Sequence, residues 1–440
     1  MSKENNMLHY FKKSSPTPVI LEESEQKSFY KKLKWQVFIS ATLGYGLYYV
    51  CRLSINVVKK PIVDSGLLTE SELGLIGSAL FFAYAIGKLT NGFLADHSNV
   101  KRFMATGLLI SALVNLVMGF TSSFFFFAIC WGINGWVQSM GSPSCIVSLS
   151  RWYTDKERGS FYGFWSTSHN IGEALTYILT AVVATSFGWQ WGFRAAAIVG
   201  LLGALIIAFF FHDSPESKGL PAVNEDFRKE KISTWEEQKA VLKNPAVWIL
   251  AVSSAFMYIS RYAVNSWGPY YFETAKGYSL TQANTLVAIS AVCGILGTAS
   301  SGFVSDRFFK GRRNKPALIF GLMNVLALSL FLLGPKNVWW VDAISMVIFG
   351  LGIGALICYL GGLMAVDIVS KQASGAALGI VGVMSYAAAG IQDIASGYLI
   401  ENNKSIVNGV TLYDFSSITV FWISSAVISV VLALFTWKKT

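Results

Sequence analysis

The chain contains 440 residues, of which 53% are hydrophobic and only 14% are charged. Soluble globular domains carry roughly 25% charged residues, so this composition excludes a soluble protein and indicates one that crosses a membrane many times. The net charge of +10 does not indicate nucleic-acid binding, because the basic residues are distributed over short segments between apolar runs, as membrane topology requires.

Residues 1–34 are polar and are expected to form a cytoplasmic tail, after which twelve apolar runs follow. Each run is close to the roughly 20 residues that span a bilayer. A polar segment at 213–243 separates the first six runs from the last six, and we expect it to be a cytoplasmic loop between two bundles, 35–212 and 244–440. The predicted helices are 35–58, 72–95, 103–121, 124–150, 160–187, 190–212, 244–272, 281–306, 316–334, 339–369, 373–400 and 414–437.

The distribution of Lys and Arg predicts the orientation in the membrane. The termini and the loops on their side carry 26 of these residues, whereas the loops on the opposite side carry 6. Because basic loops stay in the cytoplasm, both termini are expected to be cytoplasmic. The other three basic residues, Arg52, Lys88 and Arg261, lie inside predicted helices.

A short motif of glycine, aspartate and basic residues occurs twice, 210 residues apart. The spacing is about half the chain, which predicts two pseudo-symmetric six-helix bundles with a substrate bound between them. The glycine is expected to allow close helix approach, and the aspartate to bind a helix N-terminus or a basic partner. The motif resembles the signature of the major facilitator superfamily. Its residues, expected to act as conformational-switch loops, are Gly92, Asp96 and Arg102, then Gly302, Asp306 and Arg307.

Two arginines occupy matching places in the two halves. Tyr45, Tyr49 and Arg52 have the spacing of one helix face, and Arg261 lies 209 residues after Arg52. A charge inside a membrane helix is expensive unless it has a partner, so it indicates a functional site. Their forked guanidinium groups match a phosphate bidentately, although an ion pair or a side chain that reaches the membrane surface is an alternative.

Further polar residues inside the predicted helices extend this candidate site. Lys88 adds a third cation, and a tyrosine precedes each cation by about one turn: Tyr49, Tyr84 and Tyr258. His169 is expected either to bind substrate or to be an ordinary buried histidine. The two acids Glu173 and Asp393 are expected to neutralise a nearby cation or to carry a proton. No nucleophile–base pair or metal cluster is apparent in the loops, so neither an enzyme nor a metal or cofactor is expected.

Several motifs recur along nearly the whole chain. They are Gly44-Tyr45 with Tyr49-x-x-Arg52, Tyr84 with Lys88, Gln138-x-x-Gly141-x-Pro143, Trp165-x-x-x-His169-Asn170-x-Gly172, Asp213-x-Pro215, Tyr258-x-x-Arg261, and Gly379-x-x-Gly382-x-x-x-Tyr386. Together they resemble the organophosphate:phosphate antiporters of the major facilitator superfamily, with the hexose-phosphate branch closer. The resemblance implies that Arg52 and Arg261 bind phosphate, that Lys88 and His169 belong to the site, and that Tyr45, Tyr49, Tyr84, Tyr258 and Tyr386 line its cavity.

The chain departs from this family pattern inside the site. Ser166 stands where the family usually has asparagine, Glu173 replaces a glycine, and Asn265-Ser266 replaces an acid after the arginine of the seventh helix. Ala355 aligns with a tyrosine of the glycerol-phosphate branch. These differences fall on the parts of the site that would recognise the organic group and balance charge.

The expected function is exchange of a sugar phosphate, such as glucose 6-phosphate, for inorganic phosphate across the bacterial cytoplasmic membrane by a monomeric protein. Two alternatives remain at this point. One is a sensor of external hexose phosphate that acts through a partner kinase. The other is a proton-coupled symporter of another organic anion, with Glu173 or Asp393 as the proton carrier.

Overall fold

The computed structural model describes residues 9–18, 22–223, 235–370, 373–408 and 410–436. The described chain is almost entirely helical, and a helical segment occurs at each of the twelve predicted positions. Parts of the predicted tail (1–34) and of the predicted loop (213–243) lie outside the described residues. Ten of the described helical segments are long and apolar enough to cross a membrane.

Within residues 22–223, which the structure describes, the chain forms eight α-helices, because two of its membrane segments are broken. The break between α5 and α6 falls at Ser139 and Met140, and the break between α7 and α8 falls at Thr167. The helices are α2 (Glu23–Asp64), α3 (Glu70–His97), α4 (Val100–Met118), α5 (Phe124–Gln138), α6 (Gly141–Trp152), α7 (Asp155–Ser166), α8 (Ser168–Phe187) and α9 (Trp189–Phe210).

The second half is preceded by a short 3-10 helix, η1 (Glu216–Lys218), and ends in a helix that follows a β-hairpin. One of its segments changes from α-helix to π-helix in η3 before a last α-helical turn. The elements are α10 (Trp235–Lys243), α11 (Pro245–Thr274), α12 (Leu280–Phe309), α13 (Asn314–Leu333), α14 (Trp339–Cys358), η3 (Tyr359–Leu363), α15 (Met364–Asp367), α16 (Ser374–Asn402), β1 (Lys404–Val407), β2 (Val410–Tyr413) and α17 (Ser416–Phe435).

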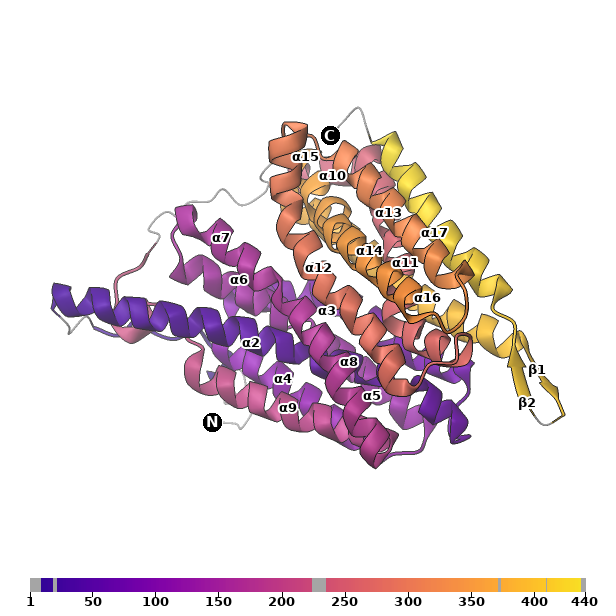
Figure 1. Ribbon diagram of the computed structural model, residues 1–440. Coiled ribbons are helices and arrows are strands. Elements are labelled where there is room, and N and C mark those ends of the chain that lie inside the picture. The colour runs from indigo at the N-terminus through magenta and orange to yellow at the C-terminus, as the bar shows by residue number, and fades with distance from the viewer. Residues whose placement is uncertain (1–8, 19–21, 224–234, 371–372, 409, 437–440) are drawn as a thin grey trace.

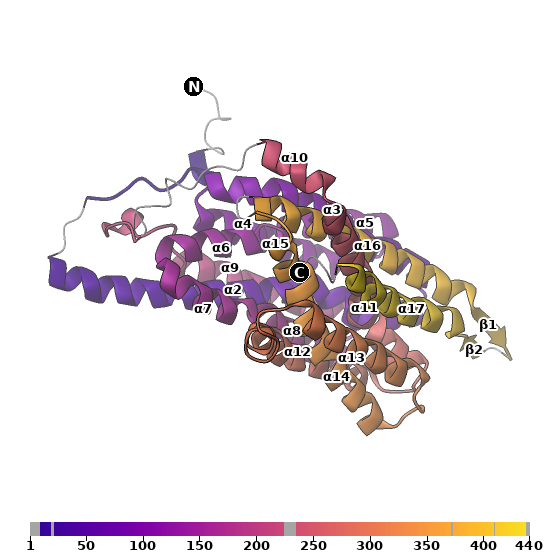
Figure 2. The same cartoon turned by 90° about the horizontal axis from the view of Figure 1, so that it is seen from above.

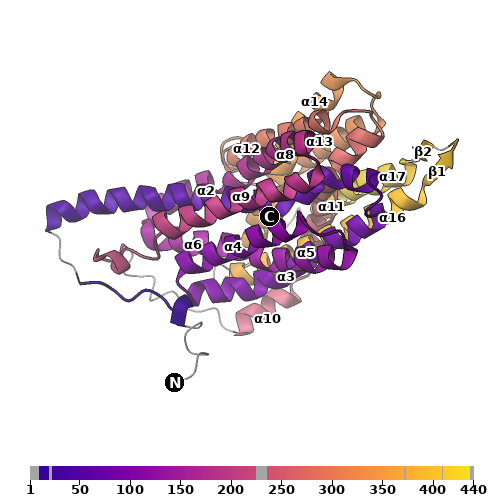
Figure 3. The ribbon, with the colours of Figure 1, turned by 90° about the horizontal axis from the view of Figure 1, so that it is seen from below.

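The helices of the two halves lie in two groups that converge at one end of the molecule (Figure 1). Across the junction, α3 packs along α16, α8 along α12, and α2 against α11. The view from above shows α3 and α16 side by side, and the view from below shows α2, α4 and α9 grouped on the first-half side (Figures 2 and 3). Within the first half, small residues let α2 and α8 come close together, since a Cβ atom on Gly172 would collide with the backbone of Gly46.

Helix α2 is longer than expected at both ends. It begins at Glu23 rather than near residue 35 and extends beyond the rest of the first half (Figures 1 and 3). At its other end it continues to Asp64 instead of stopping at residue 58. Lys59 is therefore not a loop residue, as the charge distribution suggested, but a helical residue with a fully buried side chain.

The end of the molecule that carries most of the Lys and Arg residues is called the basic end below. There Asp213 connects three segments: its Oδ1 lies 2.6 Å from Arg151 Nη1, and its carboxylate accepts hydrogen bonds from the backbone N–H groups of Ser14 and Val100. The N–H of Val100 belongs to the first turn of α4, where an anion is favoured. The part of the N-terminal segment around Ser14 is thus attached to the first half.

Candidate anion-binding site

A cavity of about 380 Å³ lies between the two halves and extends toward the basic end. Lys88, Gly92 and Asp96 follow one face of α3 along it, because their spacing is one helical turn. Pro143 and Tyr162 complete the wall on the first-half side. The second half contributes Tyr258, Gly361, Leu378, Val381, Gly382 and Ser385.

Two tyrosines at the inner end of this cavity, Tyr84 and Tyr258, both contact a third tyrosine, Tyr386. The rings of Tyr84 and Tyr386 lie 4.4 Å apart between centroids, and those of Tyr258 and Tyr386 lie 5.4 Å apart. We call Tyr84, Tyr258 and Tyr386 the tyrosine layer. Because it contains residues of both halves, the layer closes the cavity where the two bundles meet.

Arg52 lies directly behind the tyrosine layer. Its side chain is only 3% exposed, and its guanidinium carbon lies 4.0 Å from the centre of the Tyr84 ring and 4.9 Å from that of Tyr49. Within the part of the chain that the structure describes, Nε and Nη1 have no hydrogen-bond partner and no ion pair involves Arg52. A buried guanidinium with free N–H groups is a strong donor set for an anion.

Arg261, in contrast, has a carboxylate partner. Its Nη2 lies 3.7 Å from Oε2 of Glu173, and both side chains are 4% exposed. The side-chain amide of Asn265, one turn further along α11, donates to the other oxygen of Glu173. Glu173 belongs to the first half and its two partners to the second, so this cluster joins the two bundles. The structure pairs Glu173 with Arg261 and not with Lys88 or His169.

The remaining predicted residues lie around Arg52. Tyr49 contacts His169, with ring centres 5.7 Å apart, and Tyr45 contacts Trp165 at 5.0 Å. His169 is partly buried, and its Nδ1 lies 2.5 Å from the carbonyl oxygen of Ser166. That contact makes Nδ1 the donor and leaves Nε2 for another partner. Lys88 is separate from this inner group: it lies in the cavity, 5.3 Å from the Tyr386 ring.

Beyond the arginines, away from the basic end, a buried polar cluster seals the junction. Asp393 of α16 lies 3.5 Å from Lys59 of α2, and both side chains are at most 1% exposed. Ser266 and Trp267 of α11 also donate to Asp393 at 2.5 and 2.8 Å. The partner of Asp393 is therefore Lys59, and not one of the three cations expected from the sequence.

A second polar contact lies at the outer rim of this seal. Glu70, the first residue of α3, accepts hydrogen bonds from Tyr270 and Tyr413 at 2.8 and 2.9 Å. Its other oxygen lies 2.7 Å from Lys404, at the start of the β-hairpin. Both clusters connect the first half with the second. The molecule is thus closed at this end, while the cavity extends to the basic end.

The repeated loops are only partly as expected. In the second half, Asp306 pairs with Arg313 at 2.6 Å, and Arg313 also lies 3.5 Å from Asp367. In the first half, Asp96 lines the cavity and Asn99 accepts the N–H of Arg102 instead. Arg307 is exposed. The expectation that the repeated glycines allow close helix approach is wrong for this conformation, because a Cβ atom on Gly92 or Gly302 would meet nothing within 4 Å.

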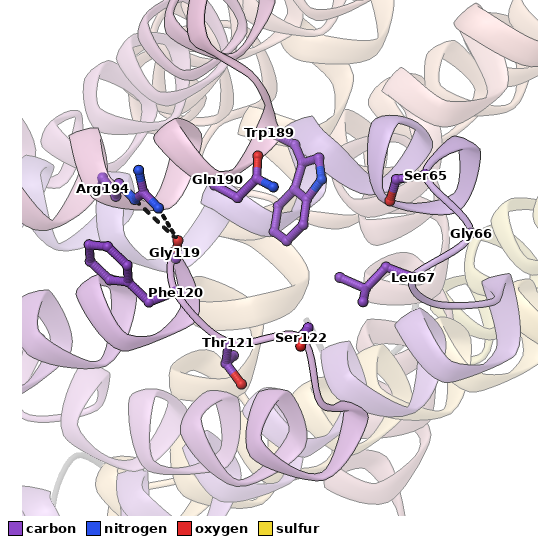
Figure 4. A pocket seen from close by; sticks show the side chains of 10 residues that line it. All are labelled: Ser65, Gly66, Leu67, Gly119, Phe120, Thr121, Ser122, Trp189, Gln190 and Arg194. Carbon is purple, nitrogen blue, oxygen red and sulfur yellow. Dashed lines mark hydrogen bonds between the residues drawn. The ribbon is translucent and has the colours of Figure 1, made fainter.

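A wider hollow, of about 470 Å³, lies at the end opposite the basic end and belongs to the first half alone (Figure 4). Trp189 and Gln190 lie beside it, and Arg194 donates to the carbonyl oxygen of Gly119 at 2.9 and 3.1 Å. Because this guanidinium is engaged by the backbone and the second half does not contribute, the hollow is a poor candidate for a site between the halves.

Sequence reasoning missed several residues of the central region. Tyr262 follows Arg261 and lies 5.3 Å from its guanidinium carbon. The carbonyl of Asn265 accepts hydrogen bonds from Tyr177 and Asn56 of the first half. The sequence spacing could have indicated that Lys59 is buried in the same region, because it lies seven residues after Arg52 and thus on nearly the same helix face.

The comparisons with known proteins agree with this architecture. The model of the Major Facilitator Superfamily matches residues 41–392. The chain belongs to the major facilitator superfamily. Its fold resembles a bacterial homologue of the human lysosomal transporter Spinster, crystallised in an inward-facing and unoccupied conformation, with a TM-score of 0.72, 18% identity and coverage of 93% of this chain and 96% of that one.

Curated relatives of similar identity include a sensor and two kinds of organophosphate transporter. The chain is 32% identical to the membrane sensor protein UhpC of Salmonella typhimurium over 88% of its length and 89% of the relative's. It is 32% identical to a probable hexose phosphate transport protein of Chlamydia trachomatis, with 94% and 93% covered. It is 31% identical to the glycerol-3-phosphate transporter of Bacillus subtilis, with 98% of each chain covered. It is thus a multi-pass membrane protein of the organophosphate:phosphate antiporter type, and not an enzyme.

Proposed function

We propose that the protein exchanges a sugar phosphate, with hexose 6-phosphate as the first choice, for inorganic phosphate. The observation that carries this proposal is the buried guanidinium of Arg52, whose Nε and Nη1 lack a partner among the described residues. A phosphate supplies the acceptor oxygens that these N–H groups need. Relatives named as hexose phosphate and glycerol-3-phosphate transporters support the same cargo class.

In this proposal each residue of the central region has a role. Arg52 of the first half and Arg261 of the second bind the phosphate from opposite sides. Lys88 attracts the anion into the cavity, His169 donates from Nε2 when both of its ring nitrogens are protonated, and the hydroxyl groups of the tyrosine layer contact the organic part. An anion between the two arginines lowers their repulsion and draws the halves together, which favours closure of the cavity and opening of the seal at Lys59 and Asp393.

Counterflow of labelled phosphate tests this function. Proteoliposomes that contain the purified protein and internal phosphate should accumulate labelled external phosphate transiently. A competition panel of glucose 6-phosphate, glycerol 3-phosphate and 3-phosphoglycerate then ranks the cargo, and we expect glucose 6-phosphate to compete best. Absence of counterflow under every loading condition would contradict the proposed exchange.

A second candidate function is sensing of external hexose phosphate through a partner kinase. The observation in its favour is the similarity to a protein named as a membrane sensor, at 32% identity. A sensor binds the same anion but has no need to move it. Tight glucose 6-phosphate binding by the purified protein without counterflow would therefore support sensing over transport.

A further inference from the structure

Glu173 is the feature that the exchange mechanism does not use. An obligatory exchanger must not close while empty, and two unshielded arginines facing each other provide that block through their repulsion. Here, however, Glu173 already provides Arg261 with an anion from the opposite half, at 3.7 Å. The carboxylate is held in place by Asn265, so it bridges the halves as a bound phosphate would.

We propose that Glu173 is a built-in counter-anion that replaces the cargo in the empty protein and takes up a proton when cargo is bound, so that the protein also carries out net uptake of phosphorylated cargo together with one proton. This inference rests on the proposed phosphate site at Arg52 and Arg261. It adds a second mode of transport to the exchange, because an empty protein whose central charges are already bridged can return without cargo.

The proton follows from the charge balance around Arg261. When a phosphate occupies the guanidinium, Glu173 loses its cationic partner and becomes a buried, unpaired carboxylate. Such a charge is strongly disfavoured, and a carboxyl group takes up a proton instead of remaining ionised. During uptake the O–H bond forms while the site is open at the end opposite the basic end, with a proton from that side. It breaks again when the cargo leaves and Arg261 pairs with Glu173 once more.

The surroundings of Glu173 allow only Arg261 to exchange partners in this way. Glu173 is near Tyr177 on its own helix, Arg52 on α2 and Arg261 on α11. The other titratable groups of this region, His169, Tyr49, Tyr258 and Tyr262, lie around Arg261. The parts of α12 and α14 that line the small hollow beside it, including Ser290 and Gly350, carry no charge. This hollow of about 10 Å³ is close to the volume that one water needs, so it offers room for a proton donor.

Asp393, the other buried acid, is less suited to this role. It pairs with Lys59 and accepts hydrogen bonds from Ser266 and Trp267, and none of these three groups is an expected cargo ligand. Cargo binding does not remove its partners. We therefore assign the proton to Glu173 and the closing contact to Asp393.

The experiment uses proteoliposomes without internal phosphate and with the membrane potential clamped at zero. An inwardly directed proton gradient should drive accumulation of labelled inorganic phosphate by the wild type, at least severalfold over vesicles without a gradient. Glu173→Gln, which cannot bind a proton, should lose this accumulation, whereas Glu173→Asp should retain it. Asp393→Asn is the matched control. The ratio of its phosphate accumulation with a proton gradient to that without one should equal the ratio of the wild type.

Three outcomes would overturn the inference: no gradient-driven accumulation by the wild type, equal accumulation by Glu173→Gln, or loss in Asp393→Asn alone. Phosphate counterflow in loaded vesicles is measured in parallel and shows that each variant is folded. Counterflow without gradient-driven accumulation contradicts only this inference. Absence of both in the wild type contradicts the exchange function itself.

Discussion

At the scale of single residues, side chains of the same type have different surroundings in this protein. Arg52 and Arg261 occupy matching places in the sequence, yet Arg52 has unpartnered N–H groups while Arg261 has a carboxylate partner. Lys88 and Lys59 are also opposite cases, since one lies in the open cavity and the other is fully buried beside Asp393. Of the three cations expected from the sequence, Lys88 therefore lies in the open cavity, whereas Arg52 and Arg261 are buried behind it.

Lys88 should act on the approach of the anion more than on its final binding. We expect Lys88→Gln to raise the apparent KM for phosphate by roughly tenfold and to weaken its dependence on salt, because a charge in a cleft raises the local concentration of an anion. The measurement is initial counterflow rate against phosphate concentration at low and high ionic strength. Lys315→Gln, an exposed change outside the cavity, is the control. An unchanged salt dependence in Lys88→Gln would refute steering.

His212 should make the fold sensitive to acid. Its ring lies at the basic end beyond α9, 7% exposed, and burial together with Lys218 and Lys101 lowers its pKa to about 4 from 6.5. Because the folded state resists protonation, this stabilising contribution is present above pH 6.5 and is lost as the pH falls toward 4. It amounts to at most roughly 3 kcal/mol.

We expect His212→Gln to flatten the loss of thermal stability of the detergent-solubilised protein between pH 6.5 and 4. The measurement is Tm against pH for both proteins. His97→Gln, at an exposed histidine of the same end, is the control. Parallel curves for the wild type and His212→Gln would show that this histidine does not contribute.

At the scale of helices, the closest contact between the halves depends on glycines of α3 and α16. A Cβ atom on Gly397 would collide with the backbone of Glu70, and one on Gly74 would collide with that of Asp393. The two helices therefore touch through their backbones where the seal lies. Both seal clusters, at Lys59 with Asp393 and at Glu70, depend on this approach.

We expect Gly397→Ala to separate α3 from α16 and to shift the protein toward a state that is open at the end opposite the basic end. Spin labels at Leu67 and Val407, in a background without native cysteines, should show a growing population at long distance. Gly379→Ala, on the same helix but with nothing within 4 Å of its Cβ atom, is the matched control. A distance distribution equal to that of the control would contradict this role of Gly397.

Helix positions followed well from the sequence because apolar length is a local property. The end of α2 did not, since Lys59 and Lys60 resemble the start of a loop and the burial of Lys59 depends on Asp393, more than three hundred residues away. The break at Ser139 and Met140 is followed by Gly141 and Pro143, which are typical of a helix start, whereas the break at Thr167 left no clear compositional signal. The hairpin of β1 and β2 was missed, although Asn408, with a φ of 52°, precedes a glycine as in tight hairpin turns.

The sequence predicted which residues belong to the site, but not which acidic side chain pairs with which basic one. Intramembrane charges and nearby tyrosines are visible in sequence, so Arg52, Tyr49, Tyr84 and Tyr258 could be singled out. Which acid neutralises which cation depends on how the two halves pack together, with α8 along α12, α2 against α11 and α3 along α16. That packing is a property of the tertiary structure, and it decided the partners of Glu173 and Asp393.

At the scale of the whole molecule, the two halves meet at a sealed end and enclose a cavity at the other. The central arginines lie between the cavity and the seal, one from each half. An anion bound there is in contact with both bundles, which is the geometry that alternating access requires. The central claim is therefore that phosphate is bound by the forks of Arg52 and Arg261 together.

Phosphate counterflow with lysine variants of both arginines tests this claim most directly. Lysine keeps the charge but not the bidentate fork, so we expect Arg52→Lys and Arg261→Lys each to raise the phosphate concentration for half-maximal exchange by about 10- to 100-fold, as for loss of one charged hydrogen bond. Arg194→Lys, at the outer hollow, should leave it unchanged. Wild-type exchange by Arg261→Lys or Arg52→Lys would contradict the account.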